Sequence, residues 1–280
     1  MEKRTSYGRT ILAYVILIIL AFLCLFFFYI LIINATRNHA QIQQGFSFLP
    51  GGSFWVNLHN VLNDANIPVL SGIKNSLIVS GAAAILATYF SSLTAYGLYA
   101  YDFKLKRPAF VFIMLILVMP TQVSALGFVR LITHMGMINT LWPLFLPSIA
   151  APAVFYFMYS YMQSTLPLDL VEAARIDGCN EFKTFNRIVL PIMKPAIAVQ
   201  AIFTFVTTWN NFFVPALIIS DNSKKTMPIL IAALRSADFM KFDMGKVYMI
   251  ILIAILPIII VYLILSRYII AGVTLGGVKE

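Results

Sequence analysis

Six long apolar runs, all free of charged side chains, dominate this chain of 280 residues. A helix needs about 20 apolar residues to cross the hydrocarbon core of a bilayer. Because lipid offers no partners to exposed backbone amides, helices that satisfy their own hydrogen bonds are the natural structure for such runs. We therefore expect an all-α, polytopic transmembrane protein of six helices. The expected spans are Ile11–Thr36, Asn75–Tyr101, Pro108–Val129, about Leu141–Gln163, Pro195–Ser220 and Val247–Ser266.

The composition excludes a soluble globular fold. Hydrophobic residues make up 60% of the chain and charged residues only 11%, whereas a soluble domain carries roughly a quarter charged residues. The net charge of +9 does not indicate nucleic acid as a partner, because the basic residues lie at the borders of the apolar runs. Membrane lipid is the partner that this placement predicts.

The distribution of basic residues predicts the orientation. An even number of spans puts both termini on one side of the membrane. Short loops rich in Lys and Arg favour the cytoplasm, and both the cluster Lys3, Arg4 and Arg9 and the loop Lys104–Arg107 lie on the side of the termini. We therefore expect cytoplasmic N- and C-termini. On the other side, the segment 34–74 is expected to contain a turn at Pro50-Gly51-Gly52 and a short helix over Ser53–Leu62.

The loop Leu166–Pro195 carries the most specific pattern in the chain. It predicts two short helices joined by a corner. Asp169 is expected to cap the first helix, with Glu172 completing a capping box, and Gly178 suits the left-handed position that ends a helix. Asn180 is expected to cap the second helix. An apolar face on such a loop must be covered, either by the protein's own helix ends or by a partner.

The same loop resembles a known motif. Glu172-Ala173-Ala174, followed at fixed spacing by Gly178, Ile188 and Leu190-Pro191, matches the EAA motif of binding-protein-dependent ABC importer permeases, and its place between the fourth and fifth spans is also theirs. The resemblance implies the type I permease fold and a coupling helix that sits in a cleft of an ATPase subunit. It also implies which residues couple to the ATPase: Glu172, Ala173, Ala174, Arg175, Asp177, Gly178, Ile188 and Pro191.

Two shorter stretches extend the resemblance from Val69 to the C-terminus. Trp209-Asn210-Asn211-Phe212 is similar to a stretch of sugar permeases, and the tail 272–279 is similar to that of carbohydrate-uptake permeases of the MalG type, although TLGG replaces a commoner TAGG. In that type the tail reaches the ATPase dimer, which implies ATPase contacts for Gly276 and Gly277. The resulting division is an N-terminal segment over residues 1–68, a permease core 69–270 with the coupling loop 165–195, and a cytoplasmic tail 271–280.

The resemblance also implies an assembly in a bacterial cytoplasmic membrane. Its members are a second homologous permease, two ATPase subunits and an extracytoplasmic sugar-binding protein. This chain has no GxxxxGK[ST] or HExxH motif, so we expect no enzyme activity and no cofactor of its own. ATP and Mg would be used by the ATPase subunits.

A polar stripe in the fifth span is a candidate translocation pathway. Gln200, Thr204, Thr207, Thr208 and Asn211 recur at three and four residues and so share one helix face, with the ring of Trp209 nearby but partly off that face. The expected pathway residues are Gln200, Thr204, Thr207, Thr208, Trp209, Asn210 and Asn211. Hydrogen bonding between helices is an equally good explanation of this stripe. In the second span, the small residues Ser80, Ala84, Ala87, Ser91 and Ala95 predict close helix packing, and Pro120 predicts a kink in the third.

Two other functions remain open from the sequence. A permease for a non-sugar solute, such as a polyamine or an anion, would carry the same EAA motif. An ion-coupled secondary carrier is a further alternative, but such carriers usually hold ionisable side chains inside their spans. The expected spans contain none, which favours energy coupling outside the bilayer.

Overall fold

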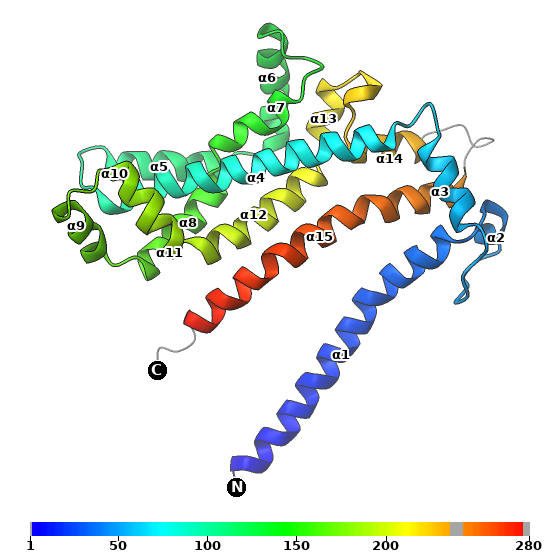
Figure 1. Cartoon of the computed structure of the whole chain (residues 1–280), viewed down its shortest axis with the longest axis horizontal. Coiled ribbons are helices and arrows are strands. Elements are labelled where there is room, and N and C mark those ends of the chain that lie inside the picture. The colour runs from blue at the N-terminus through cyan, green and yellow to red at the C-terminus, as the bar shows by residue number, and fades with distance from the viewer. Residues whose placement is uncertain (1, 236–242, 277–280) are drawn as a thin grey trace. The chain divides into compact units, whose positions relative to one another are not determined.

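The computed structural model describes residues 2–235 and 243–276, and within these ranges every regular element is a helix (Figure 1). The chain divides into two compact units, which we describe separately. The first combines Met1–Val69 with Ile231–Leu256, and the second combines Leu70–Leu230 with the residues from Pro257 onward. The expected all-α fold is confirmed for the described residues of the chain, whereas the boundaries at residues 68 and 270 stay predictions.

The first unit is built on one long apolar helix and a short polar module at its C-terminal end. Its helices are α1 (Glu2–Ala35), α2 (His39–Gln43) and α3 (Phe54–Leu62), with the end of α14 (Met227–Arg235) and the first half of α15 (Met244–Gly276). The expected short helix at Ser53–Leu62 is therefore confirmed as α3. Exposed apolar side chains cover most of α1, as expected for a helix in contact with lipid.

Buried hydrogen bonds hold the polar module of the first unit together. The Arg37 guanidinium donates to Asn34 Oδ1 at 3.3 Å, to the Gly45 carbonyl at 2.9 Å and to the Gln41 carbonyl. The Asn57 side-chain amide donates to the carbonyls of Ala35 and Arg37, each at 2.9 Å. The bond from Asn57 satisfies the carbonyl of Ala35, the last residue of α1, which has no partner within the helix.

An ion pair joins α15 to the loop after α3. Lys246 Nζ lies 3.0 Å from Asp64 Oδ2, and both side chains are largely covered. Partial burial opposes ionisation of Asp64, but the hydrogen bonds from Lys246 and from the Asn66 amide outweigh it and lower the pKa of the carboxyl below its ordinary value. The Asp64 carboxyl therefore stays ionised near neutral pH.

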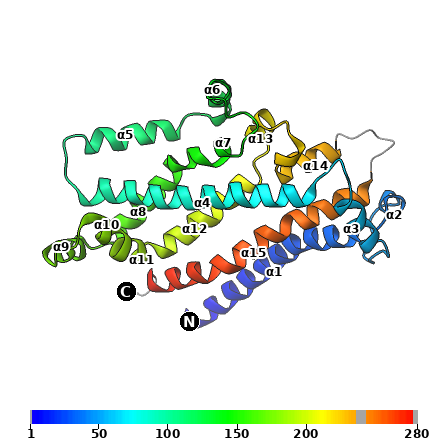
Figure 2. The same cartoon turned by 45° about the horizontal axis from the view of Figure 1, so that its top comes forward.

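The second unit contains the remaining helices (Figure 2). The first four after the long helix α4 (Val69–Ala100) are α5 (Lys106–Leu117), α6 (Thr121–His134), α7 (Trp142–Phe145) and α8 (Pro152–Thr165). They are followed by α9 (Leu168–Ile176), α10 (Glu181–Thr184), α11 (Leu190–Ile192), α12 (Lys194–Trp209) and α13 (Phe213–Ile218). Short 3₁₀ turns cover Leu146–Ile149 and Asn222–Lys224, and a π-helical turn, η2, covers Phe185–Val189.

Within residues 2–235 and 243–276, four helices are long and apolar enough to cross a bilayer, and six spans result if each of two bent pairs counts as one. The four are Tyr7–Ala35, Val69–Ala100, Trp142–Thr165 and Met244–Tyr268. The bent pairs are Lys106–Leu117 with Gln122–His134, at 100°, and Glu181–Ile192 with Lys194–Trp209, at 80°. The resulting count of four to six spans agrees with the six spans expected from the sequence.

The third and fifth expected spans are not continuous helices, which corrects the prediction. The third, Pro108–Val129, breaks between α5 and α6, and Pro120 stands at the break, where a kink was predicted. The fifth, Pro195–Ser220, ends as α12 at Trp209 and resumes as α13. Proline has no amide to donate and its ring clashes with the carbonyl four residues earlier. Pro215 therefore prevents the helix from continuing through Asn211.

The small-residue seam of α4 is confirmed as a packing surface. Ala87 and Ala95 are fully buried, and Ser80, Ala84 and Ser91 are nearly so. A group of large side chains, including Met158, Met162 and Phe185, is buried in the same core as Ala87 and Ala95. A tight turn precedes the fourth span, with φ values of +67° at Gly136 and +60° at Asn139.

We predict that Gly245→Ala destabilises the first unit. An added Cβ would lie 2.8 Å from Asn57 Oδ1 and 3.0 Å from the Arg37 carbonyl. Asn57 cannot move aside without losing its two hydrogen bonds to the end of α1 and to Arg37, so we expect a loss of about 1–3 kcal/mol in the free energy of unfolding. Thermal unfolding of the purified protein in detergent measures the loss.

Gly81→Ala is the matched control. A Cβ at Gly81, within α4, would meet no atom within 4 Å, so the change is expected to leave stability unchanged or to raise it by up to about 1 kcal/mol. Equal melting temperatures for the two variants would contradict the assigned packing around Gly245.

Candidate functional site

The predicted coupling segment folds as two short helices, α9 and α10, that meet at a tight corner. Gly178 at the corner has a φ of +78°, a left-handed conformation that residues with a Cβ rarely adopt. Asn180 Oδ1 accepts a hydrogen bond from the Lys183 amide at 2.9 Å and so caps α10. The structure therefore confirms both the glycine corner and the second cap.

The first cap was predicted wrongly. Helix α9 begins at Leu168, after Pro167, and no side-chain hydrogen bond caps it. Asp169 lies inside the first turn, so the capping box with Glu172 does not form. Pro167 has an extended backbone and occupies the N-cap position of α9. The helix therefore begins two residues earlier than it would with Asp169 as its cap. In the first turn, the Asp169 carboxylate still interacts favourably with the positive end of the helix dipole.

A charged cluster fixes the two arms of the corner to each other and to α4. Arg175 Nε on α9 lies 2.7 Å from Glu181 Oε1 on α10. The hydroxyl of buried Tyr96 on α4 donates to the other carboxylate oxygen, Oε2, at 2.9 Å. The Arg175 guanidinium also lies over the Tyr101 ring, 5.1 Å from its centre. The hydrogen bond to Glu181, and that to Tyr101, raise the pKa of Arg175 above its ordinary value.

Two further tyrosines on α4 extend this attachment. Tyr89 donates to Asn186 Oδ1 at 3.3 Å, and Tyr99 donates to the Leu166 carbonyl at 3.0 Å. Tyr89, Tyr96 and Tyr99 share one face of α4, because their spacings of seven and three are close to whole helical turns. The rings of Tyr89 and Tyr96 each lie 5.7 Å from the ring of buried Phe185. The coupling segment is therefore packed rigidly against α4.

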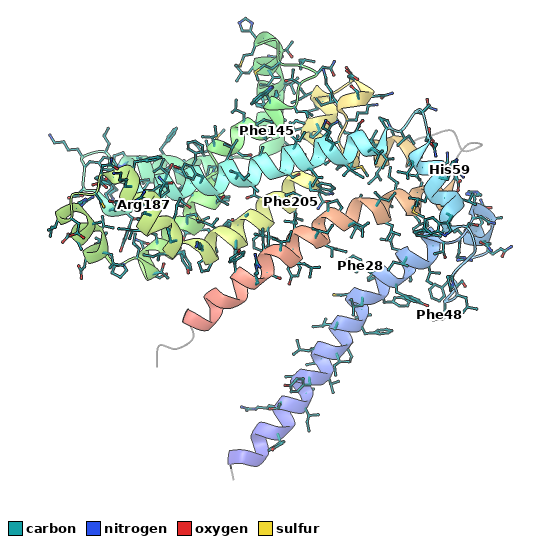
Figure 3. The ribbon with its side chains drawn as sticks, in the orientation of Figure 1. Phe28, Phe48, His59, Phe145, Arg187 and Phe205 are labelled. Carbon is teal, nitrogen blue, oxygen red and sulfur yellow. The ribbon has the colours of Figure 1, made fainter. Side chains whose placement is uncertain are left out.

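The exit from the corner is a wide helical turn followed by proline. In η2, the Leu190 amide donates to the Phe185 carbonyl five residues earlier, instead of the usual four. Pro191 comes directly after this turn and has no amide to continue the ladder. The chain then bends by 80° between Glu181–Ile192 and Lys194–Trp209. The bend aims α12 away from the corner (Figure 3).

The outer face of the corner displays most of the predicted coupling residues. Those exposed are Glu172, Ala173, Arg175, Asp177, Gly178 and Pro191, while Ile188 is half-buried. Ala174 differs, because it points inward beside Val171 and keeps only 4% of its surface exposed. The sequence prediction missed two apolar side chains on the outer face, Ile176 at 86% and Phe182 at 68% exposure. The signal for both was an apolar residue beside charged neighbours in an otherwise polar corner.

The predicted pathway residues do not form one exposed stripe. Gln200, Thr204, Thr208 and Asn211 are half-buried, and Thr207 and Asn210 are exposed. Trp209 is buried and stacks on Phe205 with ring centres 5.6 Å apart. The Thr207 hydroxyl donates within its own helix, to the Phe203 carbonyl at 2.8 Å. Both asparagines come after the last residue of α12.

The predicted tail contact falls at the end of the described chain. Gly276 is the last residue of α15, and Gly277 lies outside the described residues. No cluster of three or more His, Cys, Asp or Glu side chains that could hold a metal ion occurs among the residues that the structure describes.

The corner and its attachment to α4 lie within a region that matches a known family. Residues 83–274 match the family described as "Binding-protein-dependent transport system inner membrane component". The chain belongs to this family. It is therefore a multi-pass membrane permease, and the ion-coupled carrier alternative loses its support.

Known permeases are similar over most of this permease. It is 37% identical over 208 residues to the arabinooligosaccharides transport system permease protein AraQ of Bacillus subtilis, covering 73% of this chain and 72% of that one. It is 29% identical over 280 residues to the trehalose/maltose transport system permease protein MalG of Thermococcus litoralis, covering 99% of both chains.

A solved structure shares the fold. A chain of a bacterial ABC transporter involved in the import of the acidic polysaccharide alginate matches with a TM-score of 0.78 and 20% sequence identity. The match covers 95% of this permease and 98% of that chain. The expected ABC importer fold is thereby confirmed.

We predict that Tyr96→Phe loosens the coupling segment. The change removes the hydroxyl that donates to Glu181 and keeps the ring that packs on Phe185. A hydrogen bond to a half-exposed carboxylate contributes about 1 kcal/mol, so we expect the free energy of unfolding to fall by about that amount. Reversible unfolding in mixed detergent micelles measures the difference.

Tyr156→Phe serves as the control for this prediction. Tyr156 on α8 exposes 49% of its surface, so loss of its hydroxyl is expected to leave the free energy of unfolding unchanged. If the Tyr96 variant proved as stable as the Tyr156 variant, the hydrogen bond between Tyr96 and Glu181 would contribute nothing to the free energy of unfolding.

Proposed function

We propose that this permease forms half of the translocation pathway of an ATP-driven importer for a sugar or oligosaccharide. The single observation that carries the proposal is the outer face of the α9–α10 corner. It is rigid, since it is packed on α4, and it displays exposed Ile176 and Phe182 among charged residues. Such a mixture of apolar and charged side chains is typical of a surface that a protein partner covers.

The partner that we propose at this corner is an ATPase subunit. Each of two ATPase subunits would bind one such corner, on this chain and on a second, homologous permease. Glu172, Ala173, Arg175, Asp177 and Gly178 would form the contact, and Ala174 would support it from within. Gly276 and Gly277 would reach the ATPase from the tail. ATP and Mg would be bound and used there, and this chain would need no cofactor.

Because the corner is attached to α4, movement of a bound partner would be passed to that helix. Movement of an ATPase subunit would be transmitted through Glu181 and Phe185 to Tyr96, and so to a helix that crosses the membrane. The bend between α11 and α12 would transmit the same movement to α12. The corner would then lie in the cytoplasm, and with six spans both termini would lie there too. An extracytoplasmic binding protein would deliver the solute on the opposite side.

The proposed solute class rests on the names of the relatives. Both permeases compared above are named for carbohydrate transport, of arabinooligosaccharides and of trehalose and maltose. Thr204, Thr208 and Gln200 on α12 offer hydroxyl and amide groups of the kind that bind sugars. A non-sugar solute remains the second candidate, since the coupling corner would be the same.

We predict that Gly178→Asp abolishes stable association with the ATPase. The new carboxylate would stand on the outer face and lose its hydration in the contact, so we expect association to weaken about tenfold or more, equivalent to at least about 1.4 kcal/mol. Co-purification of ATPase subunits with the tagged permease measures it. Glu172→Lys, which reverses a charge on the same face, is expected to act in the same direction.

Gly136→Asp is the matched control. Gly136 has a similar left-handed φ of +67°, and a Cβ there would likewise meet no atom within 4 Å, so the backbone strain is comparable. It lies outside the corner, and we expect normal association. Loss of the ATPase in both variants would indicate misfolding, and retention in both would contradict the proposed contact.

We predict that proteoliposomes holding the complete importer take up a labelled oligosaccharide only with binding protein outside and ATP with Mg inside. A panel of oligosaccharides, polyamines and anions, offered to the cognate binding protein, decides the solute class. Tight binding of a polyamine or an anion alone would replace the sugar proposal. Uptake without ATP that an ionophore abolishes would contradict the importer mechanism itself.

A further inference from the structure

A short aromatic loop in the first unit turns back along α1 toward the middle of the apolar helix. We call residues Gly45–Leu49 the hook. The chain leaves α2 at Gln43 and reverses at Gly45, whose φ of +102° is accessible mainly to glycine. It returns at Gly51, whose amide donates to Thr36 Oγ1 at 2.8 Å. Figure 3 labels Phe48 on the hook and Phe28 on α1.

The hook lies against the apolar part of α1. The Phe46 ring is centred 6.0 Å from the Phe26 ring of α1, and the Phe48 ring packs edge-on against Phe46 at 4.6 Å. The Tyr29 hydroxyl of α1 donates to the Phe48 carbonyl. Phe26 also stacks on Phe22 at 5.8 Å, so a continuous run of rings leads from the middle of α1 to the hook.

These contacts fix the depth of the hook along α1. Tyr29 and Phe26 precede Ala35, the last residue of α1, by six and nine residues, or about 9 and 14 Å at 1.5 Å per residue. The charge-free apolar run of α1 continues to Ile33. The hook therefore reaches back below the end of the apolar run, to a depth of about 10 Å. Amphipathic anchors enter a membrane interface to a similar depth.

The hook combines exposed apolar side chains with a backbone that is partly satisfied by internal hydrogen bonds. Phe46, Phe48 and Leu49 expose 56%, 62% and 74% of their surfaces. The Ser47 hydroxyl accepts from the Leu49 amide at 3.1 Å and donates to its carbonyl at 3.2 Å. The Gly45 carbonyl accepts from Arg37. Internal partners of this kind are what non-helical backbone requires at membrane depth.

The surrounding sequence favours lipid over a protein as the partner. The chain has no Asp, Glu, Lys or Arg between Arg37 and Asp64, whereas the rim of a protein interface is polar and charged. Trp55 on α3, in the same segment, is 75% exposed, and tryptophan is enriched at the level of lipid headgroups.

We propose that the hook inserts Phe46, Phe48 and Leu49 into the leaflet at the C-terminal end of α1 and anchors that end of the helix in lipid. The exposed surface of the hook continues the lipid-facing surface of α1 through the Phe26–Phe46 contact, so the same medium covers both. The proposal concerns the first unit alone and is independent of the transported solute.

Site-directed spin labelling of the complete importer in liposomes tests this proposal. A nitroxide is attached to Phe48→Cys, and separately to Leu49→Cys, with Cys24 and Cys179 replaced by Ser. Leu49 guards against a local disturbance, because no ring contact depends on it. Phe27→Cys, on the exposed face of α1, is the lipid reference, and Gln43→Cys, exposed at the end of α2, is the aqueous reference. The ratio of collision rates with oxygen and with a polar nickel chelate is measured at each position.

We expect the ratio at positions 48 and 49 to exceed that at position 43 several-fold and to approach that at position 27. A ratio equal to that at position 43 would overturn the proposal and assign the hook to water or to the binding protein. Low collision rates with both reagents would also overturn it, since they would show that the partner permease covers the hook.

Discussion

Every helix in this permease is subject to one constraint, which is that a backbone amide inside a bilayer must bond within the protein. Long uninterrupted helices satisfy that constraint, and their ends occur where a residue removes a donor or an acceptor. Pro120 stands between α5 and α6, Pro191 follows the wide turn η2, and Pro215 prevents α12 from continuing past Asn211. The polar module at the end of α1 follows the same rule, because the Asn57 side chain supplies a partner to the Ala35 carbonyl, which the helix itself leaves without one.

The coupling corner depends on that framework for its rigidity. Its apolar inner side is buried on α4, where Val171 and Phe185 are nearly inaccessible. Its charged groups are partly exposed, so the ion pair between Arg175 and Glu181 contributes little stability by itself. Its value is geometric, since it holds α9 and α10 at one angle while Tyr96 holds Glu181 to α4. The outer face takes no part in these contacts, so Ile176 and Phe182 stay exposed there.

The sequence predicted those features that depend on local rules. Long apolar runs located the spans, Gly178 located the corner, and Asn180 located the start of α10. The prediction failed where two local rules competed, as at α9, where Pro167 set the start of the helix and left Asp169 inside it. It also failed for contacts between distant segments. Nothing near Glu181 in the sequence indicates that Tyr96 will donate to it, because that pairing depends on how α4 packs against the loop.

The roles of individual site residues were only partly predictable. Periodicity placed the small-residue seam of α4 correctly in the core, because small residues repeated along one helix face indicate close packing against another helix. Trp209 was expected to offer its ring beside the polar residues of α12, whereas the ring is buried and stacks on Phe205. The hook was not predicted at all. Its position requires knowing that the chain reverses at Gly45 and returns beside α1.

The π-helical turn η2 has a consequence for how this chain can change in length. A π turn is equivalent to an α-helix that has accepted one extra residue, and it costs only local hydrogen-bond geometry. Loss of one residue between Phe185 and Val189 would therefore restore a regular helix without moving either the corner or α12 from its packing partners. We therefore expect this chain to tolerate the deletion of one residue here, although the contacts of the flanking segments with α4 leave no room for a change of register elsewhere.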